Sequence, residues 1–222
     1  MNRIENLRYR LGLGLSFYLL IGCFLFLSYL FSYDALKDMP NLYETILSEP
    51  MEANLLAWLL IPGFAVLVYL FNVKFNNLEL YRMGLSKRCR YKWKILTLSQ
   101  GLILLMMGAS LFFALVFYQQ PVVLGDIIFS LCQLALLLTV IALVTALAWT
   151  LFNHSLLATI LTIAMGLMMP WLTTQPWFIT FFAIGQAPSG TAILVLLMKM
   201  ILIYIVGYLF DEKMMAHRQV IY

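Results

Sequence analysis

The sequence predicts an all-α integral membrane protein with six transmembrane helices. Hydrophobic residues make up 64% of the 222 residues, charged residues make up only 11%, and the mean hydropathy is +0.93. These values lie far outside the range of water-soluble domains. The few charged residues separate long apolar runs, and each run can be compared with the roughly 20 residues that a helical span needs. We therefore expect the whole chain, 1–222, to form one transmembrane domain.

The first half of the chain predicts an interfacial helix and two spans. Residues 1–10 carry an apolar stripe among arginines, which favours a helix lying in the cytoplasmic headgroup layer. Residues 11–32 are uncharged and form the first predicted span, whereas a cleaved signal peptide would have a shorter apolar region and a small-residue cleavage site. An acidic loop leads to the second span, 53–73, in which Pro62 and Gly63 predict a kink.

The segment 75–94 is the most basic stretch of the chain. Its first half repeats apolar residues at helical spacing (Leu78, Tyr81, Leu85), which predicts a short amphipathic helix on the membrane surface. A glycine is expected to end this helix and Ser86 to cap the next one. The segment is interpreted as a docking element for a partner, and a merely solvated basic loop is the alternative.

The second half of the chain must fold back on itself several times. No Asp, Glu, Lys or Arg lies between Asp126 and Lys199, and this stretch would extend about 108 Å as one helix, more than three bilayer cores. The further predicted spans, divided at polar breaks, are 95–118, 127–152, 156–173 and 191–210. The apolar stretch within 174–190 is too short to cross and is flanked by prolines and glycines, which predicts an outer re-entrant segment; a disordered hydrophobic loop is the alternative.

The positions of the basic residues predict that both termini are cytoplasmic. All of the 14 lysines and arginines except Lys37 and Lys199 fall in segments that this topology places inside. The formal net charge of +4 is therefore a feature of membrane topology and does not indicate a nucleic-acid partner.

The sequence contains little that could perform covalent chemistry. It has no Walker-type nucleotide motif, no metalloprotease motif and no pair of acids on a span, and the three cysteines have no metal-ligand spacing. His154 is interpreted as a turn residue. We therefore expect no catalytic residue, no metal and no cofactor in this chain.

Two charged residues stand close to or within the predicted spans. Lys199 lies inside the sixth span, where an ammonium is costly, and Asp126 opens the fourth. A snorkelling Lys199 could pair with Asp126, or Lys199 could be a polar contact in a translocation path. Both hypotheses are kept.

The order of these elements resembles the ABC-2 type permeases, the membrane subunits of type V ABC exporters. The resemblance covers the whole chain as architecture but only about 20 residues as a motif, centred on 79–88 and followed by Lys94 at the start of span three. Many relatives have a larger outer domain between spans one and two than the short acidic loop present here. The residues that the resemblance assigns to coupling are Leu78, Glu79, Tyr81, Arg82, Leu85, Ser86, Lys87 and Arg88.

The resemblance implies a transport subunit of the bacterial cytoplasmic membrane, without enzyme activity of its own. An ABC ATPase, which binds the ATP and magnesium, would dock at the coupling helix, and a second permease copy or a homologous permease would complete the path. The aromatic, weakly charged interior favours an amphipathic peptide, of a bacteriocin- or toxin-like kind, or a lipid-like substrate. The alternatives are the substrate-binding membrane subunit of a vitamin importer, which the bulky residues of span one disfavour, and a membrane-embedded enzyme.

Overall fold

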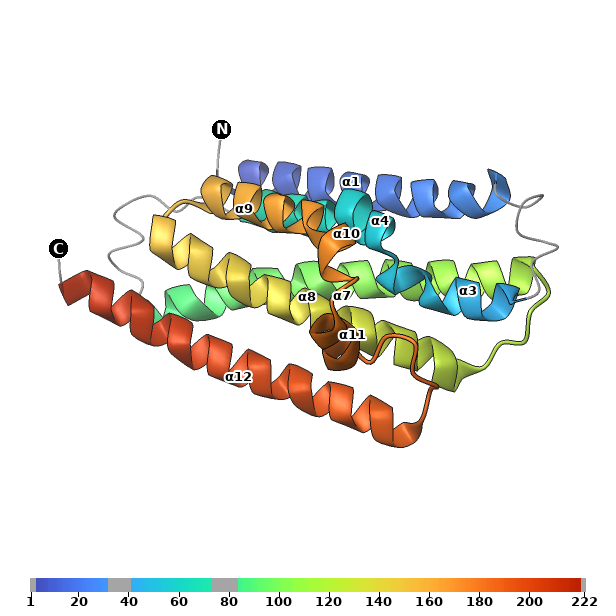
Figure 1. Cartoon of the computed structure of the whole chain (residues 1–222). Helices are drawn as coiled ribbons and strands as arrows, with labels where there is room; N and C mark the ends of the chain where they lie inside the picture. The colour runs from blue at the N-terminus through green and yellow to red at the C-terminus, as the bar shows by residue number, and fades with distance from the viewer. Residues whose placement is uncertain (1–2, 32–40, 73–83, 221–222) are drawn as a thin grey trace.

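The structure is a computed structural model that describes residues 3–31, 41–72 and 84–220. Its described residues form helices and connecting turns, without strands. The long helices lie side by side and alternate in direction along the chain (Figure 1). Helix α8 (Leu124–Phe152) is central, since it packs against α7 (Leu85–Phe117), α9 (Ser155–Leu167) and α12 (Gly190–Val220).

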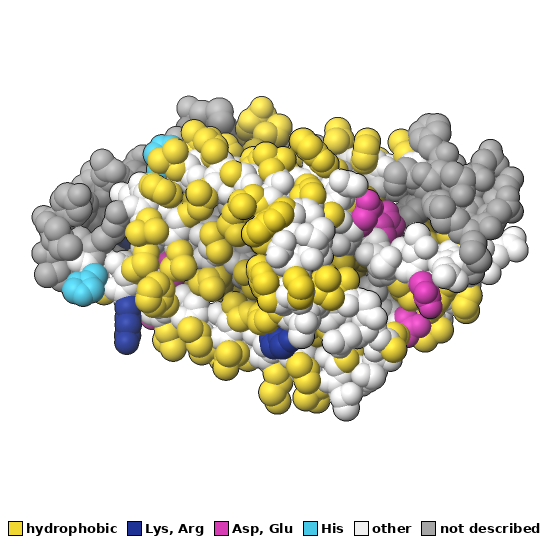
Figure 2. Space-filling model, in the orientation of Figure 1, with side chains coloured by type: hydrophobic (Ala, Val, Ile, Leu, Met, Phe, Trp, Pro, Cys, Tyr) yellow, Lys and Arg dark blue, Asp and Glu magenta, His cyan; other side chains and the backbone are white. Residues whose placement is uncertain are grey.

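Within the described residues, four helical stretches are long and apolar enough to cross a membrane. They are Leu42–Phe71, Ser86–Phe117, Leu124–Phe152 and Gly190–His217, and they contain or overlap four of the predicted spans. Shorter apolar helices, Gly12–Leu27 and Ser155–Leu167, occupy the positions of the other two. Figure 2 shows hydrophobic side chains over the middle of the molecule and the larger acidic patches toward one end. The described residues thus confirm the predicted all-helical class, and the four long apolar helices are consistent with a multi-pass membrane protein.

The first helix is longer than the sequence predicted. Helix α1 (Arg3–Phe31) is one uninterrupted helix across the boundary between residues 10 and 11, where an interfacial helix (1–10) and a separate span (11–32) were expected to meet. No proline interrupts this stretch, and a glycine alone weakens a helix without ending it. Gly14 serves packing instead, because a Cβ at this position would lie 2.6 Å from the ring of Phe71, the last residue of α5 (Ile61–Phe71).

The second span is built from several joined turns. Helix α3 (Leu42–Ser48), the single turn Glu49–Met51 and α4 (Ala53–Leu55) lead to a wide π-helical turn, Leu56–Leu60, and then to α5 (Ile61–Phe71). Pro62 lies in the first turn of α5, where its missing N–H and its ring would disturb the preceding turn of a regular helix. The wide turn absorbs this disturbance, as π-bulges commonly do.

A left-handed residue makes the turn between α8 and α9. Asn153 has a φ of 50°, a conformation that asparagine tolerates better than most residues, and α9 begins two residues later. This turn is the polar break that the sequence predicted. Helix α9 then spans only about 20 Å, less than a bilayer core of about 30 Å.

The segment after α9 is broken into short helices. Helix α10 (Met169–Leu172) follows a break in the helix at Met168, two residues before Pro170, whose nitrogen cannot donate a hydrogen bond. Helix α11 (Pro176–Phe182) comes next and lies across the middle of α8, as Figure 1 shows. The predicted span 156–173 is therefore a 13-residue helix followed by a separate turn.

Candidate functional site

A buried ion pair joins three of the long helices at the end of the bundle where α7 begins. The ammonium of Lys92 on α7 lies 2.6 Å from Oδ1 and 2.5 Å from Oδ2 of Asp211 on α12. The exposed fraction of the Lys92 side chain is 4%, and that of Asp211 is zero. Lys92 also donates to the backbone oxygen of Ala146 at 3.0 Å and to Thr150 at 2.5 Å, and both acceptors belong to α8.

Further donors complete the environment of the Asp211 carboxylate. The hydroxyl of Thr150 donates to Oδ1 at 2.5 Å, the indole of Trp93 donates to Oδ2 at 3.0 Å, and the thiol of Cys89 lies 3.6 Å from Oδ2. A buried charge is costly unless it is paired and its remaining hydrogen-bonding capacity is satisfied. Both conditions are met here, so the cluster holds α7, α8 and α12 together rather than being a free reactive group.

The residue spacing on α7 brings the side chains of this cluster together. Lys92 and Trp93 lie three and four residues after Cys89, so both are on the same face of α7 as Cys89. The ring of Trp93 packs edge-on against Tyr204 at 4.8 Å, and Gly207 lets α12 approach, because a Cβ there would lie 2.6 Å from Leu143 and 3.3 Å from Trp93.

Sequence reasoning missed this ion pair. Lys92 was counted with the basic segment 75–94, and Asp211 was counted with the charged tail. A signal was nevertheless present. The predicted topology brings the start of span three to the same membrane face as the end of span six, where Asp211 is the first acid after a long apolar run.

The predicted coupling segment is described only in its second half. Leu78, Glu79, Tyr81 and Arg82 lie outside the described residues. Leu85 begins α7, and Ser86, Lys87 and Arg88 follow it in the first turn. The expected capping role of Ser86 is wrong. Gly84 is the N-cap residue, and its backbone oxygen accepts from the amides of Lys87 and Arg88, because the helix starts earlier than the apolar pattern indicated.

The predicted pair of Lys199 and Asp126 is not formed. Asp126 accepts a hydrogen bond of 2.6 Å from the hydroxyl of Tyr43, whereas Lys199 donates at 2.8 Å to the backbone oxygen of Phe181. The ammonium of Lys199 also lies 4.8 Å from the centre of the Phe181 ring. Asp126 is in the first turn of α8, while Lys199 lies about 14 Å from the start of α12, so the two groups sit at different depths.

Two long side chains satisfy the end of helix α11. Besides the bond from Lys199 to Phe181, the amide of Gln133 on α8 donates to the backbone oxygen of Ala183 at 2.7 Å. The last carbonyls of a helix have no partner within the helix, and such groups are especially costly away from water. Gln133 is buried, and so are Phe178 and Phe182 on α11 itself. The short helix is thus fastened against the bundle on two sides.

Replacing Lys199 by methionine tests whether this contact is structural. Lys199→Met keeps the stem but leaves the carbonyl of Phe181 without its donor, so we expect a loss of about 1–3 kcal/mol in the free energy of unfolding. Thermal unfolding in detergent measures the loss, and Lys213→Met, at an exposed position of α12, is the control. Loss of transport at unchanged stability would instead favour a role of Lys199 in a translocation path.

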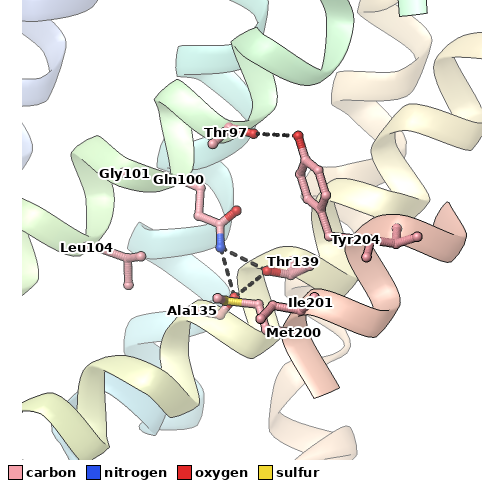
Figure 3. Close-up of a pocket in the computed structure, with 10 residues that line it drawn as sticks. Thr97, Gln100, Gly101, Leu104, Ala135, Thr139, Met200, Ile201 and Tyr204 are labelled. Atoms are coloured by element: carbon pink, nitrogen blue, oxygen red, sulfur yellow. Dashed lines mark hydrogen bonds between the residues drawn. The ribbon is translucent and has the colours of Figure 1, made fainter. Parts of the chain in front are cut away.

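A groove runs between α7 and α12 next to the ion pair. Its inner part is a cavity of about 320 Å³ lined by α7, α8 and α12, with Gln100, Thr139, Met200 and Tyr204 among its walls. Its outer part, a hollow of about 600 Å³, extends along α7 to Lys94 and Leu105. The two parts share Thr97, Gly101 and Tyr204, and we call them together the α7–α12 groove. Figure 3 shows the inner part.

The inner part of the groove has a few polar groups among apolar walls. The amide nitrogen of Gln100 donates at 2.9 Å to Thr139 and at 2.9 Å to the backbone oxygen of Ala135. The hydroxyls of Thr97 and Tyr204 lie 3.4 Å apart. In Figure 3 the amide oxygen of Gln100 is turned away from Ala135 and Thr139, on the side where Tyr204 lies. Such a lining suits an amphipathic molecule.

The described residues offer no site for a metal ion. No group of three or more His, Cys, Asp or Glu side chains in the described part of the chain is placed to hold one. The three cysteines are free and separate, and His154 is exposed in the turn before α9.

Comparisons of this chain with protein-family models, with curated proteins and with solved structures gave no match.

Proposed function

We propose that this chain is the permease subunit of an ATP-driven exporter, energised by a separate ABC ATPase that docks at the segment 75–94. The observation that carries the proposal is the direct connection of this segment to α7 and the fastening of α7 to α8 and α12 through Lys92 and Asp211. The chain has no nucleotide-binding motif, so energy must reach it from a partner.

Because α7 begins within the docking segment, a movement of this segment can be transmitted along α7 to the other helices. Helix α7 extends about 50 Å from Leu85, and its early turns carry the ion pair. A displacement at the start of α7 therefore acts on α8 and α12 as well, because these helices share buried charge-assisted hydrogen bonds with it. Rigid helices joined by hydrogen bonds and ion pairs are the kind of element that carries coupling between distant sites.

The remaining parts of the proposal concern topology, partners and substrate. Six spans with both termini in the bacterial cytoplasm would place the basic start of α7 beside the ATPase. A second copy of this chain or a homologous permease would complete the path, because six spans are few to enclose a large substrate. The apolar and aromatic character of the helices favours an amphipathic peptide or a lipid-like substrate.

Aspartates in the docking segment test the proposal. The tagged wild-type chain, purified from its native membranes in mild detergent, should carry ATP-hydrolysing activity with it. We expect Leu78→Asp combined with Leu85→Asp to reduce that activity about tenfold, because the two residues belong to the apolar side of the predicted docking helix.

A matched pair of aspartates at the opposite end of the bundle is the control. Val122→Asp with Val123→Asp changes two exposed residues of the turn before α8 and should leave the co-purified activity unchanged. Size-exclusion profiles should show normal insertion for both double variants. ATP-hydrolysing activity at the wild-type level in the Leu78 and Leu85 variant would contradict the proposal.

A further inference from the structure

One face of α7 changes from cationic to apolar along the helix. Residues at three- and four-residue spacing share this face, and each of them is exposed. In order they are Lys87, Arg90, Lys94, Thr97, Leu98, Gly101 and Leu105. The three cations lie in the first turns of α7, and the following residues line the α7–α12 groove. A basic end followed by an apolar channel matches an anionic amphiphile, whose charged group and chain follow in the same order.

The groove is open where a chain would lie. A Cβ at Gly101 would have no atom within 4 Å, so its floor is free of neighbouring side chains. Tyr204 stands at the junction of the two hollows, and Met200 and Ile201 continue the apolar wall of the inner one. From Lys94 to Leu105 the helix rises about 16 Å, which is most of one leaflet of a bilayer core of about 30 Å.

The polar groups lie between the cationic and the apolar ends. Of the two hydroxyls, that of Thr97 already donates to the backbone oxygen of Trp93 at 2.9 Å, so that of Tyr204, 3.4 Å away, is the one that can donate to another acceptor. They are one helical turn further along the groove than Lys94. This is the level at which the ester oxygens of a phospholipid lie when its phosphate contacts the lysine.

We propose that the α7–α12 groove binds one anionic phospholipid from the membrane leaflet on the side of the basic residues. Its phosphate contacts Lys94 and Arg90, an ester oxygen accepts from Tyr204, and one acyl chain lies over Gly101 toward Leu105 and Met200. Anionic lipids are concentrated in the cytoplasmic leaflet, where positive residues gather. The binding site stands independently of the proposed transport function.

Native mass spectrometry of the purified full-length chain tests the site. The protein in mild detergent is titrated with phosphatidylglycerol or with phosphatidylcholine of the same acyl chains. We expect the wild type to retain one phosphatidylglycerol about fivefold more strongly than phosphatidylcholine, since a basic residue near a lipid surface contributes roughly that factor. Lys94→Gln should reduce this preference, while Arg90 retains part of it, and Gly101→Leu should weaken retention of both lipids by filling the groove.

Two variants of the same kinds serve as controls. Lys213→Gln removes an exposed cation of α12 that lies on the opposite face of the helix from Tyr204, and Gly12→Leu fills open space on α1. Both should retain lipid as the wild type does. Equal retention of the two lipids by the wild type, unchanged retention in Lys94→Gln and Gly101→Leu, or equal losses in the controls would show annular lipid only and overturn the proposal.

Discussion

Replacing Asp211 by alanine is expected to lower the free energy of unfolding by about 3–5 kcal/mol. The substitution leaves the ammonium of Lys92 buried without its counter-charge and removes the acceptor of the Trp93 indole. Breaking one partner of a buried ion pair has costs of this size, because the remaining charge stays desolvated. Unfolding in detergent, followed by circular dichroism against added sodium dodecyl sulfate, measures the loss.

A double substitution distinguishes the contribution of the ion pair to stability from that of side-chain packing. Lys92→Met with Asp211→Leu replaces both charges by apolar side chains, so most of the loss should be recovered. Lys213→Ala, at an exposed position two residues further on, should change stability by less than about 0.5 kcal/mol. A loss below about 1 kcal/mol in Asp211→Ala, or a double variant less stable than the single one, would contradict the role assigned to the pair.

The second large effect is expected at Gly207. Leucine at this position must displace Leu143 and the rigid ring of Trp93, because its Cβ would lie 2.6 Å from the first and 3.3 Å from the second. Overpacking alone costs about 1–3 kcal/mol. Because Gly207 is one turn before Asp211, the displacement of α12 also disturbs the ion pair, and we expect a total loss of about 3 kcal/mol.

The size of the inserted side chain provides the control for Gly207. Gly207→Ala adds only a Cβ, and the tip of Leu143 can rotate away from it, so its cost should be much smaller. Gly12→Leu, where nothing lies within 4 Å, should be neutral or slightly stabilising, since leucine favours helix over glycine. Equal stability of Gly207→Leu and Gly12→Leu would show that α12 does not approach α8 as closely as described.

Composition and apolar run length predicted most of the fold. Long uncharged runs indicate helices that can cross a membrane, and four of the predicted spans coincide with such helices. The break at Asn153 was predicted as well, because polar residues that favour turns interrupt the apolar run there. These features are local, and a single sequence contains the information for them.

The features that the sequence did not predict are tertiary contacts. Lys92 and Lys94 are two residues apart and look alike in sequence, yet one is buried against Asp211 and the other is exposed. Only the rotation of α7 about its axis, set by packing against α8 and α12, distinguishes them. The predicted pairing of Lys199 with Asp126 was wrong for the same reason. The partner of Lys199 is a backbone carbonyl of α11, and every residue has such a carbonyl, so the sequence gives no signal for it.

The two fastenings of α12 differ in strength, and this has a consequence for motion. Near its C-terminal end, α12 is held by the carboxylate of Asp211, which accepts from Lys92 and Thr150. Toward its N-terminal end, it is held by the bond from Lys199 to the backbone oxygen of Phe181 and by apolar packing. The second attachment is the cheaper one to release. If α12 tilts, it should therefore pivot near Asp211, and the end of the helix at Gly190, beyond the contact of Lys199 with α11, should move furthest.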